Sequence, residues 1–210
     1  MVSLITLDLI QQAVALKPPV FDPRAAQLKM SPQPRPLQRL PDMGGEPRQA
    51  ATLLLLYPIE ERLHFVLTRR PESMASHAGQ ISLPGGRREP GEPFDQTAIR
   101  ETCEEVNICE GIEIIGALTD LYIPPSDFLV YPFVGYLPLR PDLQVITSEV
   151  AEIIECPLDL LLDDSIKGRG TIQIREFTVD IMWYEINGYR VWGATAIMLA
   201  EMEARLRACL

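Results

Sequence analysis

The chain has 210 residues, which is enough for one domain with a sizeable core. Its 19 basic and 29 acidic residues give a formal net charge of −10, which argues against general nucleic-acid binding, because that affinity depends largely on cations that displace counterions from phosphates. Apolar runs of about 18 residues without polar breaks are missing, so we expect no membrane association. The scattered cysteines predict reduced thiols, no zinc site and a cytoplasmic location.

The N-terminal region is predicted to hold a short helix followed by an extended arm. Apolar residues recur at near-helical spacing from Leu4 to Leu16, and Pro18 and Pro19 end that pattern. From Pro18 to Arg48 the sequence is rich in proline and is typical of an arm or linker without a core of its own. We therefore place a helix and proline-rich arm in residues 1–48 and the main domain in residues 49–210. The length and proline content of the arm also leave a homodimer open.

Runs of apolar, β-compatible residues follow the arm, at 51–70, 112–120, 128–137 and 171–192. The first and last runs are predicted to be hairpins, and Asn187-Gly188 is the strongest turn signal among them. A helix is expected from about residue 195 to residue 208. Strands on both sides of an acidic helix, with another helix at the end, predict an α/β layered domain.

The acidic helix carries Glu101, Glu104 and Glu105 close together. At 100° per residue these glutamates occupy one arc, and the opposite arc is predicted to be core and holds Ile99, Thr102, Cys103 and Val106. Like charges at such spacing oppose the helix by roughly 0.2–0.5 kcal/mol per pair. The cluster is therefore either an ordinary solvated acidic face or a functional site.

The surrounding sequence favours a functional site. Gly86, then five residues, Glu92, then seven residues, and the run from Arg100 to Ile108 closely resemble the Nudix box, the loop–helix–loop signature of Nudix pyrophosphohydrolases. The stretch departs from that signature at Thr102, where an apolar residue is usual, and at Asn107, where glycine is usual. The resemblance implies a Nudix fold, an α/β/α sandwich with a mixed central sheet, over about residues 50 to 200.

The resemblance also implies a metal-dependent hydrolase of phosphoanhydrides. A bound Mg²⁺ or Mn²⁺ would offset the phosphate charge and acidify a water, and such hard cations prefer oxygen ligands. By resemblance, Glu101, Glu104 and Glu105 are the metal ligands, Glu101 positions or deprotonates the water, and the Gly85 carbonyl also contacts the metal. Arg100 is expected to hold these carboxylates in place.

Two further carboxylates have open roles. Glu92 either pairs with Arg100 to orient the helix or contributes to the outer coordination of the metal. Glu149, with Glu152 as its rival, lies where Nudix enzymes often supply an additional carboxylate from a loop, and either residue could instead be surface charge.

The segment before the box, "LTRRPESMASHAGQISLPGG", resembles a second signature, that of the coenzyme A pyrophosphatase branch of the Nudix family. It matches at Leu67, Thr68, Arg70, Gly79 and the Pro-Gly-Gly that ends it, and His77 and Gln80 also fit. It departs at three positions, namely Pro71, Ala75, where an arginine is usual, and Leu83.

Substrate contacts are expected from this segment. Arg69 and Arg70 either bind a phosphate or are solvated charges at a strand end, and His77 either orients a phosphate or caps the loop. Gln80 is a further substrate-binding candidate.

The implied substrate is a small nucleotide derivative, namely coenzyme A or a relative, cleaved to 3′,5′-ADP and (acyl-)4′-phosphopantetheine. ADP-ribose or another nucleoside-diphosphate derivative is the alternative if the changes at Pro71 and Ala75 alter the preference. A non-catalytic Nudix-derived binding module is a third reading, but such modules typically lose the box carboxylates, which this sequence keeps.

Overall fold

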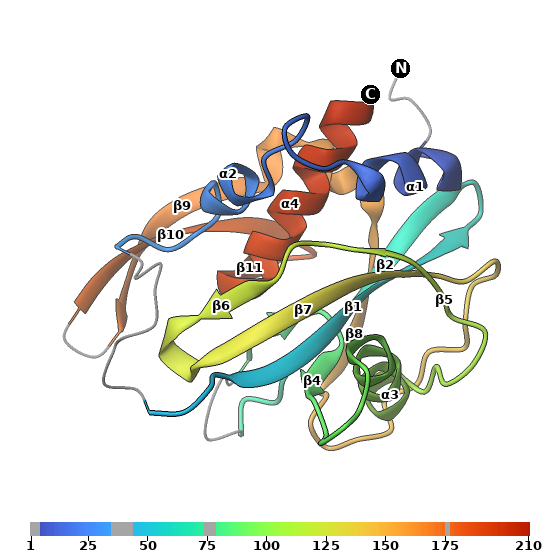
Figure 1. Cartoon of the computed structure of the whole chain (residues 1–210), viewed down its shortest axis with the longest axis horizontal. Helices are drawn as coiled ribbons and strands as arrows, with labels where there is room; N and C mark the ends of the chain where they lie inside the picture. The colour runs from blue at the N-terminus through green and yellow to red at the C-terminus, as the bar shows by residue number, and fades with distance from the viewer. Residues whose placement is uncertain (1–4, 35–43, 74–78, 175–176) are drawn as a thin grey trace.

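A mixed β-sheet lies between helices on its two faces in the computed structural model, which describes residues 5–34, 44–73, 79–174 and 177–210 (Figure 1). One face is covered by α3 (Phe94–Val106). The other face is covered by α4 (Gly193–Cys209), with α1 (Leu7–Ala15) and α2 (Pro23–Leu28) packed beside it. This arrangement confirms the predicted α/β/α sandwich. No helix in the described ranges is long and apolar enough to cross a membrane.

The central sheet has the strand order β3-β2-β1-β7-β5. Three further strands pair outside this order: β4 with β1, β6 with β7, and β8 with β2. Its strands are β1 (Arg48–Ile59), β2 (Arg62–Arg69), β3 (Ile81–Ser82), β4 (Gly85–Arg87), β5 (Glu113–Ala117), β6 (Leu121–Ile123), β7 (Phe128–Tyr136) and β8 (Glu152–Pro157). The β1–β2 pair is the predicted first hairpin. Strands β1 and β7 run parallel, which makes the sheet mixed as predicted.

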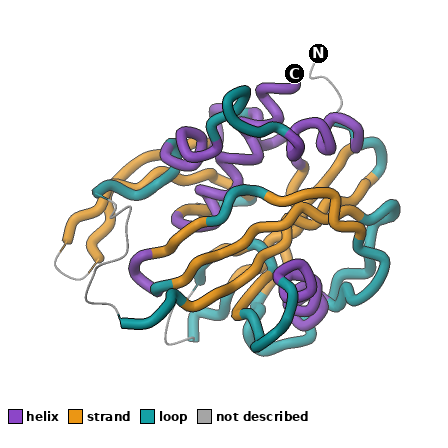
Figure 2. The backbone as a smooth tube through the Cα atoms, viewed as in Figure 1, coloured by secondary structure: helices purple, strands orange, loops and turns teal. Residues whose placement is uncertain are grey.

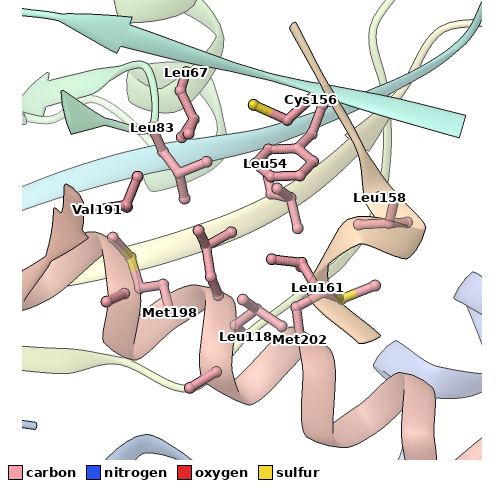
Figure 3. Close-up of a cluster of buried hydrophobic side chains, with 14 of the residues drawn as sticks. Leu54, Leu67, Leu83, Leu118, Cys156, Leu158, Leu161, Val191, Met198 and Met202 are labelled. Atoms are coloured by element: carbon pink, nitrogen blue, oxygen red, sulfur yellow. The ribbon is translucent and has the colours of Figure 1, made fainter. Parts of the chain in front are cut away.

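The central strand β1 forms two cores because its side chains alternate between the faces of the sheet. Leu54 and Leu56 point toward α4, whereas Leu53 and Leu55 point toward α3, and all four are fully buried. Figure 3 shows the α4 side of this arrangement, where Leu54 and Leu67 of the sheet face Met198 and Met202 of the helix. The four consecutive leucines in "TLLLLY" therefore serve both layers, as expected for a strand that is buried on both faces.

A separate three-stranded antiparallel sheet stands beside the sandwich (Figure 2). It consists of β9 (Lys167–Ile174), β10 (Phe177–Ile186) and β11 (Tyr189–Trp192). Asn187 and Gly188 connect β10 to β11 with φ angles of 50° and 81°, so the predicted Asn-Gly turn is confirmed. The short strand β8 was not predicted, because Glu152, Glu155 and Pro157 break the apolar pattern that marks a strand.

The N-terminal segment packs on its own chain. The extended arm predicted from residue 18 to residue 48 is wrong at residues 23–28, which form α2 with Asp22 as its N-cap and Pro23 in its first turn. On α4, Arg205 donates hydrogen bonds to the carbonyls of Ala13 and Leu16, at 3.0 and 2.9 Å, and so caps the C-terminus of α1.

The prediction of four reduced thiols is also wrong, because Cys103 and Cys109 are joined by a disulfide. Asn107 ends α3 in the left-handed conformation, with φ of 67°, and turns the chain back on itself. That turn brings the Cα atoms of the two cysteines within 4.5 Å of each other. Cys156 and Cys209 are free.

Candidate active site

The candidate site lies on α3 where the helix faces β1 and β4. The helix starts after Pro93 and ends at the left-handed residue Asn107, which here takes the position of the usual glycine. The Thr102 hydroxyl donates to the Ala98 carbonyl at 2.7 Å, so its burial in place of an apolar residue leaves no unsatisfied group. Both departures from the box are therefore accommodated within the helix.

The three glutamates of α3 have different environments. Glu104 is exposed, Glu101 is partly covered with a side chain 16% exposed, and Glu105 is buried at 7%. The prediction that all three lie on the arc opposite the core is wrong for Glu105, which is buried and contacts Thr68 of β2. The sequence could not reveal this difference, because it depends on a strand about 40 residues away along the chain.

Arg100 organises this carboxylate cluster. Its guanidinium donates to Glu101 at 2.8 Å, to Glu104 at 3.2 Å and to Glu92 at 2.9 Å, and it also donates to the Arg87 carbonyl at 3.0 Å. Hydrogen bonds to these carboxylates, first of all to Glu92, raise the pKa of Arg100 above its ordinary value. The arginine therefore ties the helix to the loop before it.

Of the two roles left open for Glu92, the pairing with Arg100 is the one that its contacts fit. Its carboxylate also accepts hydrogen bonds from the Thr97 hydroxyl, at 2.7 Å, and from the Glu89 amide, at 3.1 Å. The hydrogen bond from Arg100 is the largest influence that lowers the pKa of Glu92 to about 2. These contacts use most of its lone pairs, so Glu92 serves to hold the loop against α3.

The charges of Glu101 and Glu105 are less fully compensated than that of Glu92. Burial raises the pKa of Glu105 to about 7, and the nearby negative charges of Glu101 and Glu149 add to the effect, while Arg70 opposes it. Burial also raises the pKa of Glu101, and Arg100 opposes that shift. Two carboxylates are thus held together in a partly desolvated place, where their negative charges are unfavourable.

Thr68 on β2 is a site residue whose role the sequence did not reveal. It is 1% exposed, and its hydroxyl lies 3.3 Å from the Glu105 carboxylate and 3.3 Å from the Ser82 hydroxyl. The hydroxyl therefore fixes the direction in which Glu105 points. The sequence marks Thr68 only as a match to the second signature, and no spacing within the chain indicates its partner.

The two glycines at the end of that signature are explained by close contacts. A Cβ on Gly85 would lie 2.4 Å from the Ala51 carbonyl oxygen, and a Cβ on Gly86 would lie 2.4 Å from a carboxylate oxygen of Glu101. Gly85 therefore allows β4 to pair with β1, and Gly86 leaves space for Glu101. The proposed contact of the Gly85 carbonyl with a metal stays a prediction.

Arg69 and Arg70 are both paired with carboxylates from the β7–β8 connection and β8. Arg69 donates to Glu152 at 2.9 Å, and Arg70 lies 3.3 Å from Glu149. Of the two rival carboxylates, Glu149 is the one whose negative charge raises the pKa values of Glu101 and Glu105. Glu152 instead accepts a hydrogen bond from the Tyr189 hydroxyl, at 2.7 Å.

The remaining two substrate-binding candidates are less well defined. The backbone carbonyl of Gln80 accepts a hydrogen bond from the Arg70 amide at 3.0 Å, which fixes the strand end but leaves the role of its side chain a prediction. His77 and Ala75 lie outside the described residues.

The site can accommodate a hard divalent cation. Its donors are carboxylates, which Mg²⁺ and Mn²⁺ prefer, and a cation between Glu101 and Glu105 would offset their unfavourable charges. Among the described residues, no three such side chains form a group that could hold a metal ion. One nitrogen of Arg100 bridges Glu101 and Glu104, at 2.8 and 3.2 Å, whereas Glu105 contacts Thr68.

Comparisons with known proteins identify the family of this chain. Residues 47–177 match the NUDIX domain family. "Nudix hydrolase 3" of Caenorhabditis elegans is 31% identical over 168 residues, covering 72% of this chain and 70% of its own length. "Uncharacterized Nudix hydrolase NudL" of Photorhabdus laumondii is 33% identical over 189 residues, covering 86% and 94%.

Solved structures are also similar to this chain. One is a binary complex of a C. elegans Ap4A hydrolase, which is 26% identical with a TM-score of 0.45 and covers 53% of this chain and 81% of its own. With the sandwich, the box geometry and the relatives taken together, the chain belongs to the Nudix hydrolase family, whose members act on phosphoanhydrides.

Proposed function

We propose that this Nudix hydrolase cleaves the phosphoanhydride of coenzyme A or its derivatives, giving 3′,5′-ADP and (acyl-)4′-phosphopantetheine. The observation that supports hydrolysis is the under-compensated carboxylate pair Glu101 and Glu105 beside the glycine turn. Strongly shifted pKa values of this kind are common at functional sites. The choice of coenzyme A rests on the resemblance of residues 67–86 to the corresponding signature.

A divalent metal fits this proposal. Mg²⁺ or Mn²⁺ would be held by Glu101, Glu104 and Glu105, with the Gly85 carbonyl as a further ligand. When bound, the metal supplies charge neutralisation at the phosphates and lowers the pKa of a coordinated water. Nudix enzymes generally depend on such ions.

The chain's own residues have separate tasks in the reaction. Glu101 accepts a proton from the attacking water, whose oxygen forms the new bond to phosphorus as the anhydride P–O bond breaks. Arg100, hydrogen bonded to Glu101 at 2.8 Å, keeps the carboxylate directed at that water. Thr68 keeps Glu105 in position, and Glu149 is an additional carboxylate that Arg70 can release toward the site.

ADP-ribose, or another nucleoside-diphosphate derivative, is the second candidate substrate. It is favoured by the pairing of Arg69 and Arg70 with Glu152 and Glu149, which occupies the two arginines that are candidates to bind a substrate phosphate. Ala75 also removes an arginine that the coenzyme A branch usually has. A non-catalytic module is disfavoured by the retained carboxylates.

The test is a screen of phosphoanhydrides with Mg²⁺ or Mn²⁺, with products identified by mass spectrometry. We expect coenzyme A to yield 3′,5′-ADP and 4′-phosphopantetheine, and EDTA to abolish the reaction. Faster cleavage of ADP-ribose than of coenzyme A would replace the substrate assignment with the second candidate. Full activity in EDTA would remove the metal-dependent mechanism.

Location and assembly are further proposals. We propose a cytoplasmic protein, although the disulfide between Cys103 and Cys109 is more typical of oxidising compartments. Fractionation of the source cells tests this location, with recovery of the protein in the cytoplasmic fraction expected. A homodimer is tested by light scattering coupled to size-exclusion chromatography.

A further inference from the structure

An open groove of about 760 Å³ adjoins the candidate active site on the side of β1 and β4. It is lined by Arg100 and Glu101 of α3, by the start of β1 with the residues before it, and by the end of β4 with the loop that follows. A ligand that presents its scissile bond to Glu101 can therefore extend along this groove. Of the described residues expected to bind substrate, Arg69, Arg70 and Gln80 do not line it, so its contacts are additional to theirs.

Three arginines line the groove without being neutralised. Within the described residues, carboxylates pair with Arg69, Arg70 and Arg100 but not with Arg48, Arg87 or Arg88. Apart from the Arg100–Glu101 pair, the lining carries these three guanidinium groups against two exposed carboxylates, Glu46 and Glu89. A locally positive groove in a chain of net charge −10 indicates an anionic ligand.

Two of these arginines are held in place by neutral partners. Arg88 donates to the Gln49 side chain at 2.7 Å and lies over the Phe94 ring at 4.4 Å. Arg48 donates to the Ser126 carbonyl and lies over the Phe128 ring at 4.2 Å. Such contacts fix the guanidinium groups without cancelling their charge, so they are pre-organised for an anion.

Arg87 is the third arginine and the one free to reach a ligand. Its side chain is exposed, and no hydrogen bond or ion pair joins it to another described residue. Its backbone is fixed, because β4 pairs with β1 at Ala50 and the Arg87 carbonyl accepts a hydrogen bond from Arg100. It also follows Gly86 directly, and Gly86 packs against the Glu101 carboxylate.

We propose that the groove binds a phosphate group of the substrate that lies beyond the anhydride being cleaved, with Arg87 in direct contact and Arg48 and Arg88 providing the surrounding positive charge. The proposal rests on the proposed function in one respect, that Glu101 marks the reacting centre. Arginine suits this ligand because its planar fork matches phosphate oxygens. The phosphate has two chemical sources, a phosphomonoester on the ribose or further phosphates of a longer polyphosphate chain.

The kinetic test compares substrates that differ only in the additional phosphate. Arg87→Gln should lower kcat/KM for coenzyme A by about tenfold to a hundredfold, mainly through KM, and change that for 3′-dephospho-coenzyme A less than threefold. Arg87→Lys should recover part of the loss, and Arg62→Gln, which removes an exposed charge paired with Asp159, should change neither. A second pair, diadenosine tetraphosphate against ADP-ribose, identifies the polyphosphate source if the selective loss appears there instead.

A binding measurement separates this proposal from the proposed function. In EDTA, calorimetry should give tighter binding of 3′,5′-ADP or adenosine tetraphosphate than of AMP, and Arg87→Gln should remove that difference. This result would uphold the groove even if no substrate were hydrolysed. Equal losses on substrates with and without the additional phosphate, or wild-type behaviour of Arg87→Gln and Arg48→Gln in both measurements, would overturn it. Unchanged melting temperatures of the variants exclude misfolding as the cause.

Discussion

Two buried carboxylates, one on each side of the sheet, differ sharply in their surroundings. Glu201 on α4 is fully buried and accepts hydrogen bonds from the Thr119 amide and hydroxyl, the Gln27 side chain and Arg205. Glu105 on α3 is 7% exposed and has a hydrogen bond only from Thr68 among the described residues. The same functional group is thus fully compensated on one helix and poorly compensated on the other.

This difference distinguishes a carboxylate that stabilises the fold from one that is available to bind a ligand. A buried carboxylate with a full set of partners holds segments together, and Glu201 with Arg205 ties α1 and α2 to the sandwich. A buried carboxylate that lacks partners destabilises the fold unless a bound ligand compensates its charge. The contrast therefore predicts that changes on α4 act on stability, whereas changes on α3 act on activity and on the response to metal.

The largest effect is expected from Glu101→Gln. Loss of a positioned acid or base lowers turnover by roughly 10²–10⁴-fold, and the substitution should leave the unfolding midpoint near that of the parent protein. Steady-state hydrolysis with Mg²⁺ or Mn²⁺ measures the effect, and Glu113→Gln on the exposed face of β5 is the matched control. A parent-like rate from Glu101→Gln would contradict its proposed role.

On α4, Arg205→Met should act on stability alone. Removing one partner of a buried ion pair costs about 3–5 kcal/mol, because Glu201 and the carbonyls at the end of α1 lose their donor. Urea unfolding measures this loss, and Arg24→Gln, at an exposed bridge to Asp120, should cost less than about 1 kcal/mol. Similar small losses from both variants would show that the buried pair contributes no more than the exposed one.

The stability of the metal-free protein should depend on the ionisation of Glu105. Its pKa is about 7 in the folded chain against an ordinary value of 4.5, so the folded state favours the protonated form. The resulting stabilisation is complete below about pH 4.5 and is lost as pH rises through 7, by about 1–3 kcal/mol.

Urea unfolding in EDTA at pH 5 and pH 8 measures this slope. Glu105→Gln should flatten it, and Mg²⁺ should stabilise the parent protein more at pH 8 than at pH 5. A slope that survives Glu105→Gln would assign the ionisation to another group.

A smaller effect is expected from Thr68, which directs Glu105. Thr68→Val keeps the shape of the side chain but removes the hydroxyl, and it should weaken Mn²⁺ binding by about tenfold, while Thr68→Ser retains it. Calorimetric titration with Mn²⁺ measures the change without reference to activity. Equal affinities of the valine and serine variants would leave the hydroxyl without a role at the metal.

Local patterns predicted much of the fold. Asn187-Gly188 located a hairpin, the leucine run located the central strand, and the spacing from Gly86 to Ile108 located the helix that carries the glutamates. The family resemblance also predicted that Arg100 lies beside its carboxylates. This prediction was accessible because these residues are close together in the sequence.

The missed features depend on residues far apart in the chain. The burial of Glu105 against Thr68 and the pairing of Arg70 with Glu149 join segments separated by 37 and 79 residues. Short-range periodicity carries no information about such pairs. Helix α2 was hidden by the prolines around it, although Asp22-Pro23 is a helix-start signal that could have located it.

The disulfide has a consequence for the motion of the site. A helix usually frays at its last turn, and in α3 that turn carries Glu104 and Glu105. The bond from Cys103 to Cys109 encloses both glutamates in a small covalent ring, so local melting of this turn cannot carry the two carboxylates far apart. Because Cys109 is exposed, a reductant can open that ring without unfolding the sheet, and the spacing of the carboxylates then depends on hydrogen bonds alone.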